Sequence, residues 1–277
     1  MRRILRAVFA AALMLAAVPA LTQAADNPFP IGKTSEPEAY RGDMSLPSGL
    51  SFGYSRMNDT VDISNFSISF GGQPLPPGAV VVSSARHNTT ITLARFDTWI
   101  FPFLDVYGLA ATLNGYASNV AYKVNPVPGL PTLAIPATIE PSYNGHFYGV
   151  GATLAGGYKM FFASYDINRQ WVSISLFDNT VPALSQGIRA GVHGKVHGAN
   201  AAAYVGGFHL SLRDAVLTGQ NFIPGLPSGT FSLVATPQSA WNTIAGANIE
   251  ISRHLVVTAE AGFGTRKQFT IMPSVRF

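Results

Sequence analysis

The last eleven residues of the chain alternate between apolar and polar side chains. One face of an extended strand would carry Phe269, Ile271, Pro273, Val275 and Phe277. The opposite face would carry Gln268, Thr270, Met272, Ser274 and Arg276. Because successive side chains of a strand point to opposite faces, the pattern separates a lipid-compatible face from a water-compatible face. It predicts a strand that crosses a bilayer, although Pro273 cannot donate a ladder hydrogen bond and is expected at a bulge or an edge.

The aromatic end of this segment carries a family resemblance. It resembles the closing strand of Gram-negative outer-membrane β-barrels, whose assembly machinery reads a final aromatic residue with alternating apolar positions before it. The resemblance implies that Phe269, Ile271, Val275 and Phe277 form an assembly signal. It also implies that the partners are outer-membrane lipids, the barrel-assembly machinery and periplasmic chaperones. Residues 95–109, 148–162 and 259–269 are similar to a group of proteobacterial outer-membrane barrels without an established activity, which implies location and fold but no catalytic residues.

The first 24 residues predict export. Three arginines, Arg2, Arg3 and Arg6, precede an apolar run over residues 8–18, and small residues allow cleavage after Ala24. We interpret residues 1–24 as a secretory signal peptide. The alternative is a retained membrane anchor, but the apolar run is shorter than the roughly 20 residues that a spanning helix needs.

The composition of the remaining chain limits the class of protein and the kinds of partner. Three of the 18 basic residues lie in the leader, so about 15 remain against 14 acidic residues, and this balance does not favour nucleic acid as a partner. The chain has no cysteine, and its histidines lack metal-site spacing, so we expect neither a metal nor a cofactor. Charged residues make up 12% of the chain, about half the usual share for a soluble domain. An exported chain of this kind is either a membrane barrel or a secreted β-sandwich.

Loop lengths favour the barrel. Residues 25–47 are rich in proline and are expected to be a periplasmic N-terminal segment, followed by a barrel over residues 48–277. With Phe277 in the periplasm, the turns near residues 98–103, 159, 195–200 and 253–254 fall inside and are short. The connections over residues 125–141, 176–183 and 214–240 fall outside and are longer, as outer-membrane barrels require. The pattern predicts an all-β, transmembrane, antiparallel up-and-down barrel of ten strands, or of twelve if residues 66–70 and 79–84 also pair.

The same alternation predicts which side chains face the lumen. The residues expected there are Asp166, Arg189, His193, His209, Arg213, Glu250, Glu260 and Arg276. Apolar residues are expected on the lipid side, among them Ile91, Leu93, Tyr107, Leu109, Ala111, Leu113, Tyr204, Phe208 and Leu210. The charges either form a ladder of pairs that fills a narrow barrel or line a hydrated path, which inward glycines would widen. We therefore expect a non-enzymatic protein, either a narrow passive channel for small polar solutes or a structural and surface-interaction protein, whose external ligand the sequence does not reveal.

One pair of residues suggests an alternative activity. His209 and Ser211 are two residues apart, which resembles the spacing in outer-membrane phospholipase A and the lipid A deacylases. The resemblance implies a lipid-directed hydrolase in which His209 deprotonates the Ser211 hydroxyl. No orienting acid or amide is identifiable in the sequence, and the expected inward direction of both side chains would keep them from a lipid substrate.

Overall fold

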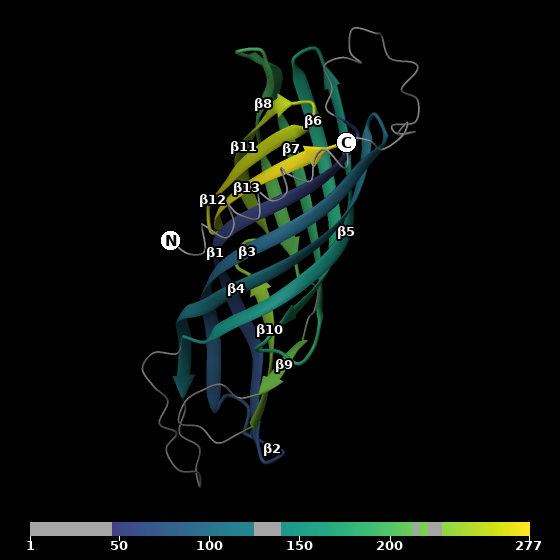
Figure 1. Ribbon diagram of the computed structural model, residues 1–277. Coiled ribbons are helices and arrows are strands. Elements are labelled where there is room, and N and C mark those ends of the chain that lie inside the picture. Colours follow the sequence, from purple (N-terminus) through teal and green to yellow (C-terminus); the bar gives the residue numbers. More distant parts are fainter. Residues whose placement is uncertain (1–45, 125–139, 213–215, 221–228) are drawn as a thin grey trace, which may run out of the picture.

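In a computed structural model, ten antiparallel strands form one closed ring (Figure 1). The structure describes residues 46–124, 140–212, 216–220 and 229–277. The strands of the ring are β1 (Ser48–Phe70), β3 (Val80–Phe101), β4 (Leu104–Val124), β5 (Ser142–Tyr158), β6 (Phe161–Ile174), β7 (Val181–Val196), β8 (Ala199–Ser211), β11 (Trp241–Ser252), β12 (Leu255–Phe263) and β13 (Lys267–Arg276). The ring closes because β13 pairs with β1, which confirms the predicted barrel of ten strands.

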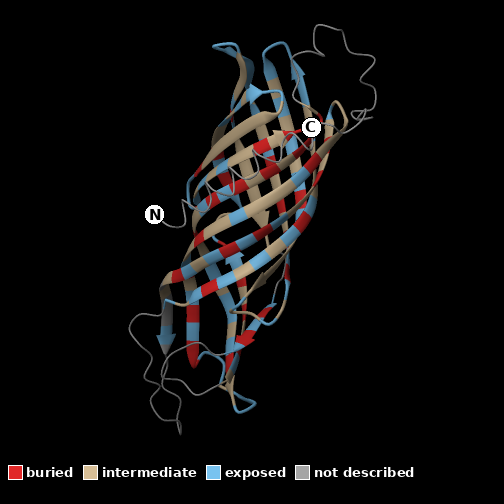
Figure 2. Ribbon diagram, in the orientation of Figure 1, coloured by how far each residue is buried: buried red, intermediate tan, exposed pale blue. Residues whose placement is uncertain are grey.

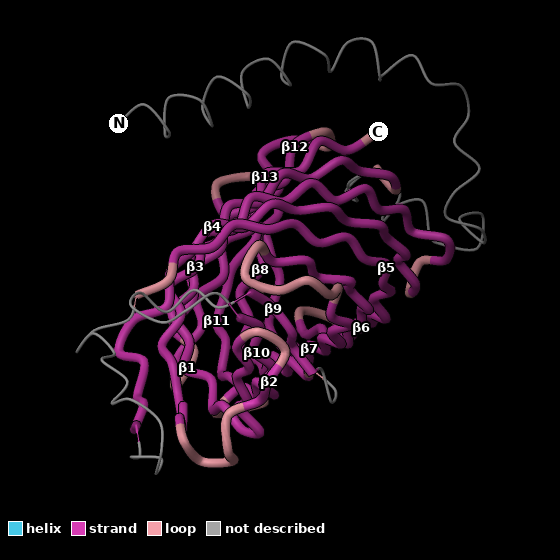
Figure 3. The backbone as a smooth tube through the Cα atoms, turned by 90° about the horizontal axis from the view of Figure 1, so that it is seen from below, coloured by secondary structure: helices cyan, strands magenta, loops and turns pink. Residues whose placement is uncertain are grey.

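Three further strands lie outside this ring. They are β2 (Gln73–Pro74), β9 (Val216–Gln220) and β10 (Gly229–Pro237). All regular elements of the described residues are strands, as the view from below shows (Figure 3). No helix among these residues has the length and apolarity needed to cross a membrane. The predicted signal peptide and almost all of the predicted periplasmic segment, residues 1–45, lie outside the described residues.

Turn length distinguishes the two ends of the barrel. The connections β3–β4, β5–β6, β7–β8 and β11–β12 each span two residues and lie at the end that holds the C terminus (Figure 1). The longer connections lie at the opposite end. Because outer-membrane barrels have short periplasmic turns and long external loops, the C-terminal end is the periplasmic end.

Strand β1 changes partner halfway along its length. Its first half pairs with β13 from Gly49 to Asn58. Its second half pairs with β10 from Val61 to Phe70, and β10 in turn pairs with β9. Residues 66–70 and 79–84, the basis of the alternative with twelve strands, instead continue β1 and the start of β3 beyond the ring. The long connection after β8 was expected to be a plain loop, but it contains the β9–β10 hairpin.

The outward face of the wall is apolar where the strands form the ring. On β13, Phe269 and Ile271 remain 49% and 40% exposed, so no second protein layer covers them. On β1, apolar outward residues up to Tyr54 give way to Arg56 and Asn58 toward the extracellular end. Asn58 donates a hydrogen bond to Asn88 on the neighbouring strand β3, at 2.6 Å. Polar contacts between outward side chains of this kind are expected beyond the hydrocarbon region, so they mark the extracellular limit of the apolar band.

On three strands the predicted facing is wrong. The structure turns the following residues of β3, β4 and β8 toward the lumen rather than the lipid: Ile91, Leu93, Tyr107, Leu109, Ala111, Leu113, Tyr204, Phe208 and Leu210. The hydroxyl groups of Tyr107 and Tyr204 donate hydrogen bonds to carboxylates inside the barrel. Pairing with the neighbouring strands fixes the facing of each strand, and a narrow barrel accepts apolar side chains in its interior.

Candidate functional site: the barrel interior

The periplasmic half of the lumen holds a chain of ion pairs. Arg276 on β13 donates to Asp97 on β3 at 2.5 Å, across the width of β1. Arg95 lies between two carboxylates, 3.6 Å from Asp97 and 2.5 Å from Asp105. Arg276 also donates to the backbone carbonyl of Pro47, which ties the start of the described chain to the last strand. These contacts neutralise charges that would be costly to leave unpaired.

A second network continues from this chain around the wall. The guanidinium of Arg95 lies 3.8 Å from the centre of the Tyr107 ring. The Tyr107 hydroxyl donates to Asp166 at 2.7 Å, and the Thr153 hydroxyl donates to the same oxygen at 2.8 Å. Asn168 accepts a hydrogen bond from the buried hydroxyl of Ser185 at 2.7 Å. The polar contacts therefore extend from β13 to β7.

The opposite part of the wall has its own ion pair. Arg189 on β7 and Glu260 on β12 are 2.9 Å apart, although two strands separate them in the sheet. The Tyr204 hydroxyl donates to the same Glu260 oxygen at 3.1 Å. Such a contact can only cross the concave side of the wall, so Arg189, Tyr204 and Glu260 all face the lumen. Nearer the periplasm, Asn200 donates to Glu250 at 3.0 Å.

Three inward glycines do not widen the lumen, because larger side chains lie on them. A Cβ atom at Gly151 would lie 2.6 Å from the Tyr107 hydroxyl oxygen, and one at Gly246 would lie 2.5 Å from the Tyr204 ring. At Gly262 the side chains of Asn242 and Gln268 occupy the corresponding space. The glycines therefore let polar and aromatic side chains lie flat against the wall, which favours a filled interior over an open path.

An apolar cluster lies at the extracellular end of the barrel. Its buried members come from β1, β3, β7, β9 and β10 (Figure 2), and they are Ile68, Val80, Val82, Val181, Leu217, Phe231, Leu233 and Ala235. Phe231 stacks on Phe66 at 6.4 Å between ring centres and meets the edge of Phe177 at 6.0 Å. The backbone N–H of Asp178 donates to Thr218 of β9, so the hairpin is also fastened to the β6–β7 connection. We call this cluster the extracellular cap.

The histidine and serine of the hydrolase alternative lie on the outer face of β8. His209 is the pairing partner of Gln186 and of Trp241, whose ring centre lies 5.0 Å from the imidazole. Ser211 pairs with Leu184, which also faces outward. The expected inward direction of His209 is wrong because Tyr204 and Phe208 take the lumen side of this strand. Among the hydrogen bonds of the described residues, none joins His209 to Ser211 or to a carboxylate, so the geometry gives the hydrolase no support.

The remaining predicted lumen residues are placed as follows. Asp166, Arg189, Glu250, Glu260 and Arg276 lie inside the barrel in the contacts given above. His193 also lies on the inward register, with its ring centre 6.4 Å from that of Phe162. Arg213 lies outside the described residues. In the part of the chain that the structure describes, no group of three or more acidic residues and histidines is arranged to hold a metal ion.

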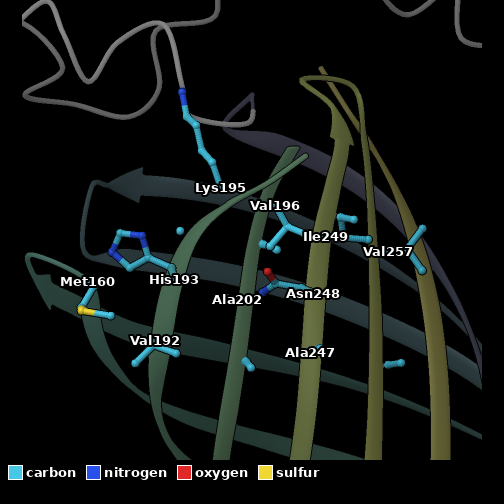
Figure 4. Close-up of a pocket in the computed structure, with 14 residues that line it drawn as sticks. Met160, Val192, His193, Lys195, Val196, Ala202, Ala247, Asn248, Ile249 and Val257 are labelled. Carbon is cyan, nitrogen blue, oxygen red and sulfur yellow. The ribbon is translucent and has the colours of Figure 1, made fainter. Parts of the chain in front are cut away.

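A hollow of about 550 Å³ lies near the periplasmic turns and is lined from β7, β8, β11 and β12 (Figure 4). Its lining is mainly apolar and includes Val192, Ala203, Ala247 and Val257. These four side chains and several others that line the hollow are on the outward register, whereas others, such as His193 and Asn248, are on the inward register. Because the four apolar side chains face outward, lipid chains would fill the hollow in a membrane. It therefore belongs to the lipid-facing surface rather than to the lumen.

The closed antiparallel ring, with an apolar outer face and a charged inner face, defines a transmembrane β-barrel. Its even strand number and the short turns at the C-terminal end are those of the bacterial outer membrane, where this protein lies. The chain matches no family model and no curated protein sequence.

Solved structures similar to this chain are outer-membrane barrels. The outer membrane protein OprG from Pseudomonas aeruginosa has a TM-score of 0.43 and 10% identity, over 85% of this chain and 99% of the other. The translocator domain of the autotransporter NalP from Neisseria meningitidis has a TM-score of 0.40 and 9% identity, over 83% and 88%. The β domain of the Bordetella autotransporter BrkA has a TM-score of 0.40 and 11% identity, over 84% and 100%. Because all three TM-scores are below 0.5, we assign the fold from the strand pairing and from the two faces of the wall.

Proposed function

We propose that this chain is a non-enzymatic outer-membrane barrel that is closed to solutes and presents an extracellular sheet as an interaction surface. The observation that carries the proposal is the extracellular cap, in which apolar side chains of the β9–β10 hairpin pack against those of β1, β3 and β7. The side chains of Arg95 and Arg189 remain 21% and 23% exposed, so the interior has space beside these charges that water can occupy. The cap separates this partly hydrated interior from the cell exterior.

Beyond the ring, the outer face of the sheet formed by β1 and β10 supports a role in surface interaction. Hydroxyl groups of β1 and β10 form cross-strand pairs there, Ser67 with Ser232 at 2.8 Å and Ser69 with Thr230 at 3.0 Å. This face is solvent-exposed and rich in hydroxyl groups, so it offers donors and acceptors to a polar partner. The proposal assigns no particular partner to this face. Recognition of Phe269, Ile271, Val275 and Phe277 by the barrel-assembly machinery stays a prediction from the sequence.

Conductance across a planar bilayer tests the closed state. Pure refolded protein is expected to give no reproducible single-channel steps, because the cap and the packed tyrosines leave no continuous aqueous path. Insertion is verified in parallel by flotation of proteoliposomes and by the gel shift between heated and unheated samples. The absence of single-channel steps then cannot be explained by failed insertion of the protein. Steps of uniform size from inserted protein would contradict the proposal and favour the narrow channel.

A further inference from the structure

At the extracellular end of the ring, two buried polar side chains have groups without a hydrogen-bond partner among the described residues. Arg266, in the β12–β13 connection, is fully buried at 0% exposure, and Asn242 at the start of β11 is 4% exposed. Neither Nη1 nor Nη2 of Arg266 has a hydrogen-bond partner among the described residues, and the same holds for both amide atoms of Asn242. Leaving buried donors unpaired is unfavourable, so such groups point to a missing partner.

Both side chains lie beside Phe208 of β8. The Nε of Arg266 donates to Asp59 on β1 at 3.0 Å, while the guanidinium carbon lies 5.8 Å from the centre of the Phe208 ring on β8. Asn242 is the direct pairing partner of Phe208. The guanidinium therefore reaches from Asp59 on β1 toward Phe208 on β8, the residue that pairs with Asn242.

Bare backbone forms the wall beside Asn242. A Cβ atom at Gly262 would lie 2.6 Å from the Asn242 amide nitrogen, and one at Gly264 would lie 3.1 Å from the amide oxygen. Ile244, which is fully buried, is the next inward residue along the same strand. Glycine at these two positions makes room for the Asn242 amide.

Donors outnumber acceptors in this cluster. Both carboxylate oxygens of Asp59 are engaged, one by Arg266 and the other by the backbone N–H of Thr60 at 2.9 Å. The guanidinium and the amide together offer six N–H bonds that none of these groups satisfies. We propose that Arg266 and Asn242 form a binding site for a small monovalent anion, such as a halide or the carboxylate of formate.

The first test is thermal unfolding of the refolded full-length protein in a non-ionic detergent. Sodium chloride, bromide, formate and gluconate are compared at equal ionic strength, with gluconate as the anion too large for the site. A site that is filled tenfold above its dissociation constant shifts the ratio of folded to unfolded protein by about tenfold. The melting temperature is therefore expected to rise and saturate with chloride, bromide and formate, but not with gluconate. Equal melting temperatures in all four salts would overturn the proposal.

Two substitutions test whether the anions raise the melting temperature by binding at this site. Asn242→Leu keeps the branched shape of the side chain but removes the amide donors, and Arg266→Lys keeps the charge opposite Asp59 but removes the guanidinium fork. Both are expected to abolish the dependence on the anion. Asn248→Leu, on the inward face of the same strand but nearer the periplasm, is the matched control and is expected to retain it.

Crystals soaked in bromide give a direct readout that does not depend on stability. An anomalous peak is expected within hydrogen-bonding distance of the Arg266 guanidinium and the Asn242 amide. A salt effect that persists in Asn242→Leu, or bromide peaks only at the protein surface, would show that the anions act elsewhere and would overturn the site. If Arg266→Lys fails to fold, Asn242→Leu and the bromide map still decide the question.

Discussion

At the scale of single residues, the ion pair between Asp97 and Arg276 ties the last strand to the rest of the barrel. Both side chains are buried, and the pair joins β13 to β3 across β1. Replacing Asp97 by Asn would leave the Arg276 guanidinium buried and only partly compensated. We expect Asp97→Asn to lower the free energy of unfolding by about 3–5 kcal/mol, the usual cost of breaking a buried pair. Urea unfolding of the refolded protein in detergent, followed by tryptophan fluorescence, measures this loss.

The matched control for this substitution is Asp62→Asn. Asp62 is exposed on the outer face of β1, where it pairs with Thr236 in the sheet. The same chemical change there is expected to alter stability by less than about 0.5 kcal/mol. Equal losses in the two variants would show that charge removal in general, rather than the buried pair, determines the stability.

At the scale of elements, the β9–β10 hairpin depends on Phe231 for its attachment. This ring is 3% exposed and contacts both Phe66 and Phe177. Phe231→Ala is expected to remove about 3–5 kcal/mol of packing. Because the ring of ten strands closes without the hairpin, the loss should appear as faster external proteolysis within residues 213–239, while the gel shift of the folded barrel persists. The control is Thr230→Ala at the exposed neighbouring position, which should be cleaved at the wild-type rate. If Phe231→Ala instead unfolds the whole barrel, the hairpin contributes to the stability of the ring itself.

The elements also show what the sequence could predict. Strand number and the facing of β13, where Phe269 and Ile271 point outward, follow from alternation because only one face can meet hydrocarbon. Alternation alone misassigns β8, since Tyr204 and Phe208 are as apolar as a lipid-facing residue but fill the narrow lumen. The hydrogen bond from Tyr204 to Glu260 joins residues 56 positions apart, and only the closed ring brings them together. The extracellular cap was missed for the same reason, because its members come from five strands distant in sequence.

At the scale of the whole molecule, the structure requires that one face of a single wall touches acyl chains. Val150 on β5 and Val205 on β8 face outward and are 58% and 64% exposed, whereas Ser274 on β13 is buried inside the barrel. Because the chain has no cysteine, single-cysteine variants can be labelled without background. An environment-sensitive thiol dye at Val150→Cys or Val205→Cys is expected to emit at the short wavelengths typical of hydrocarbon and to be quenched by brominated lipids. Ser274→Cys, the control inside the wall, is expected to resist both the dye and the quencher. Quenching at Ser274→Cys but not at the two outward positions would mean that the wall is turned inside out relative to this structure, and the assignment as a membrane barrel would fail.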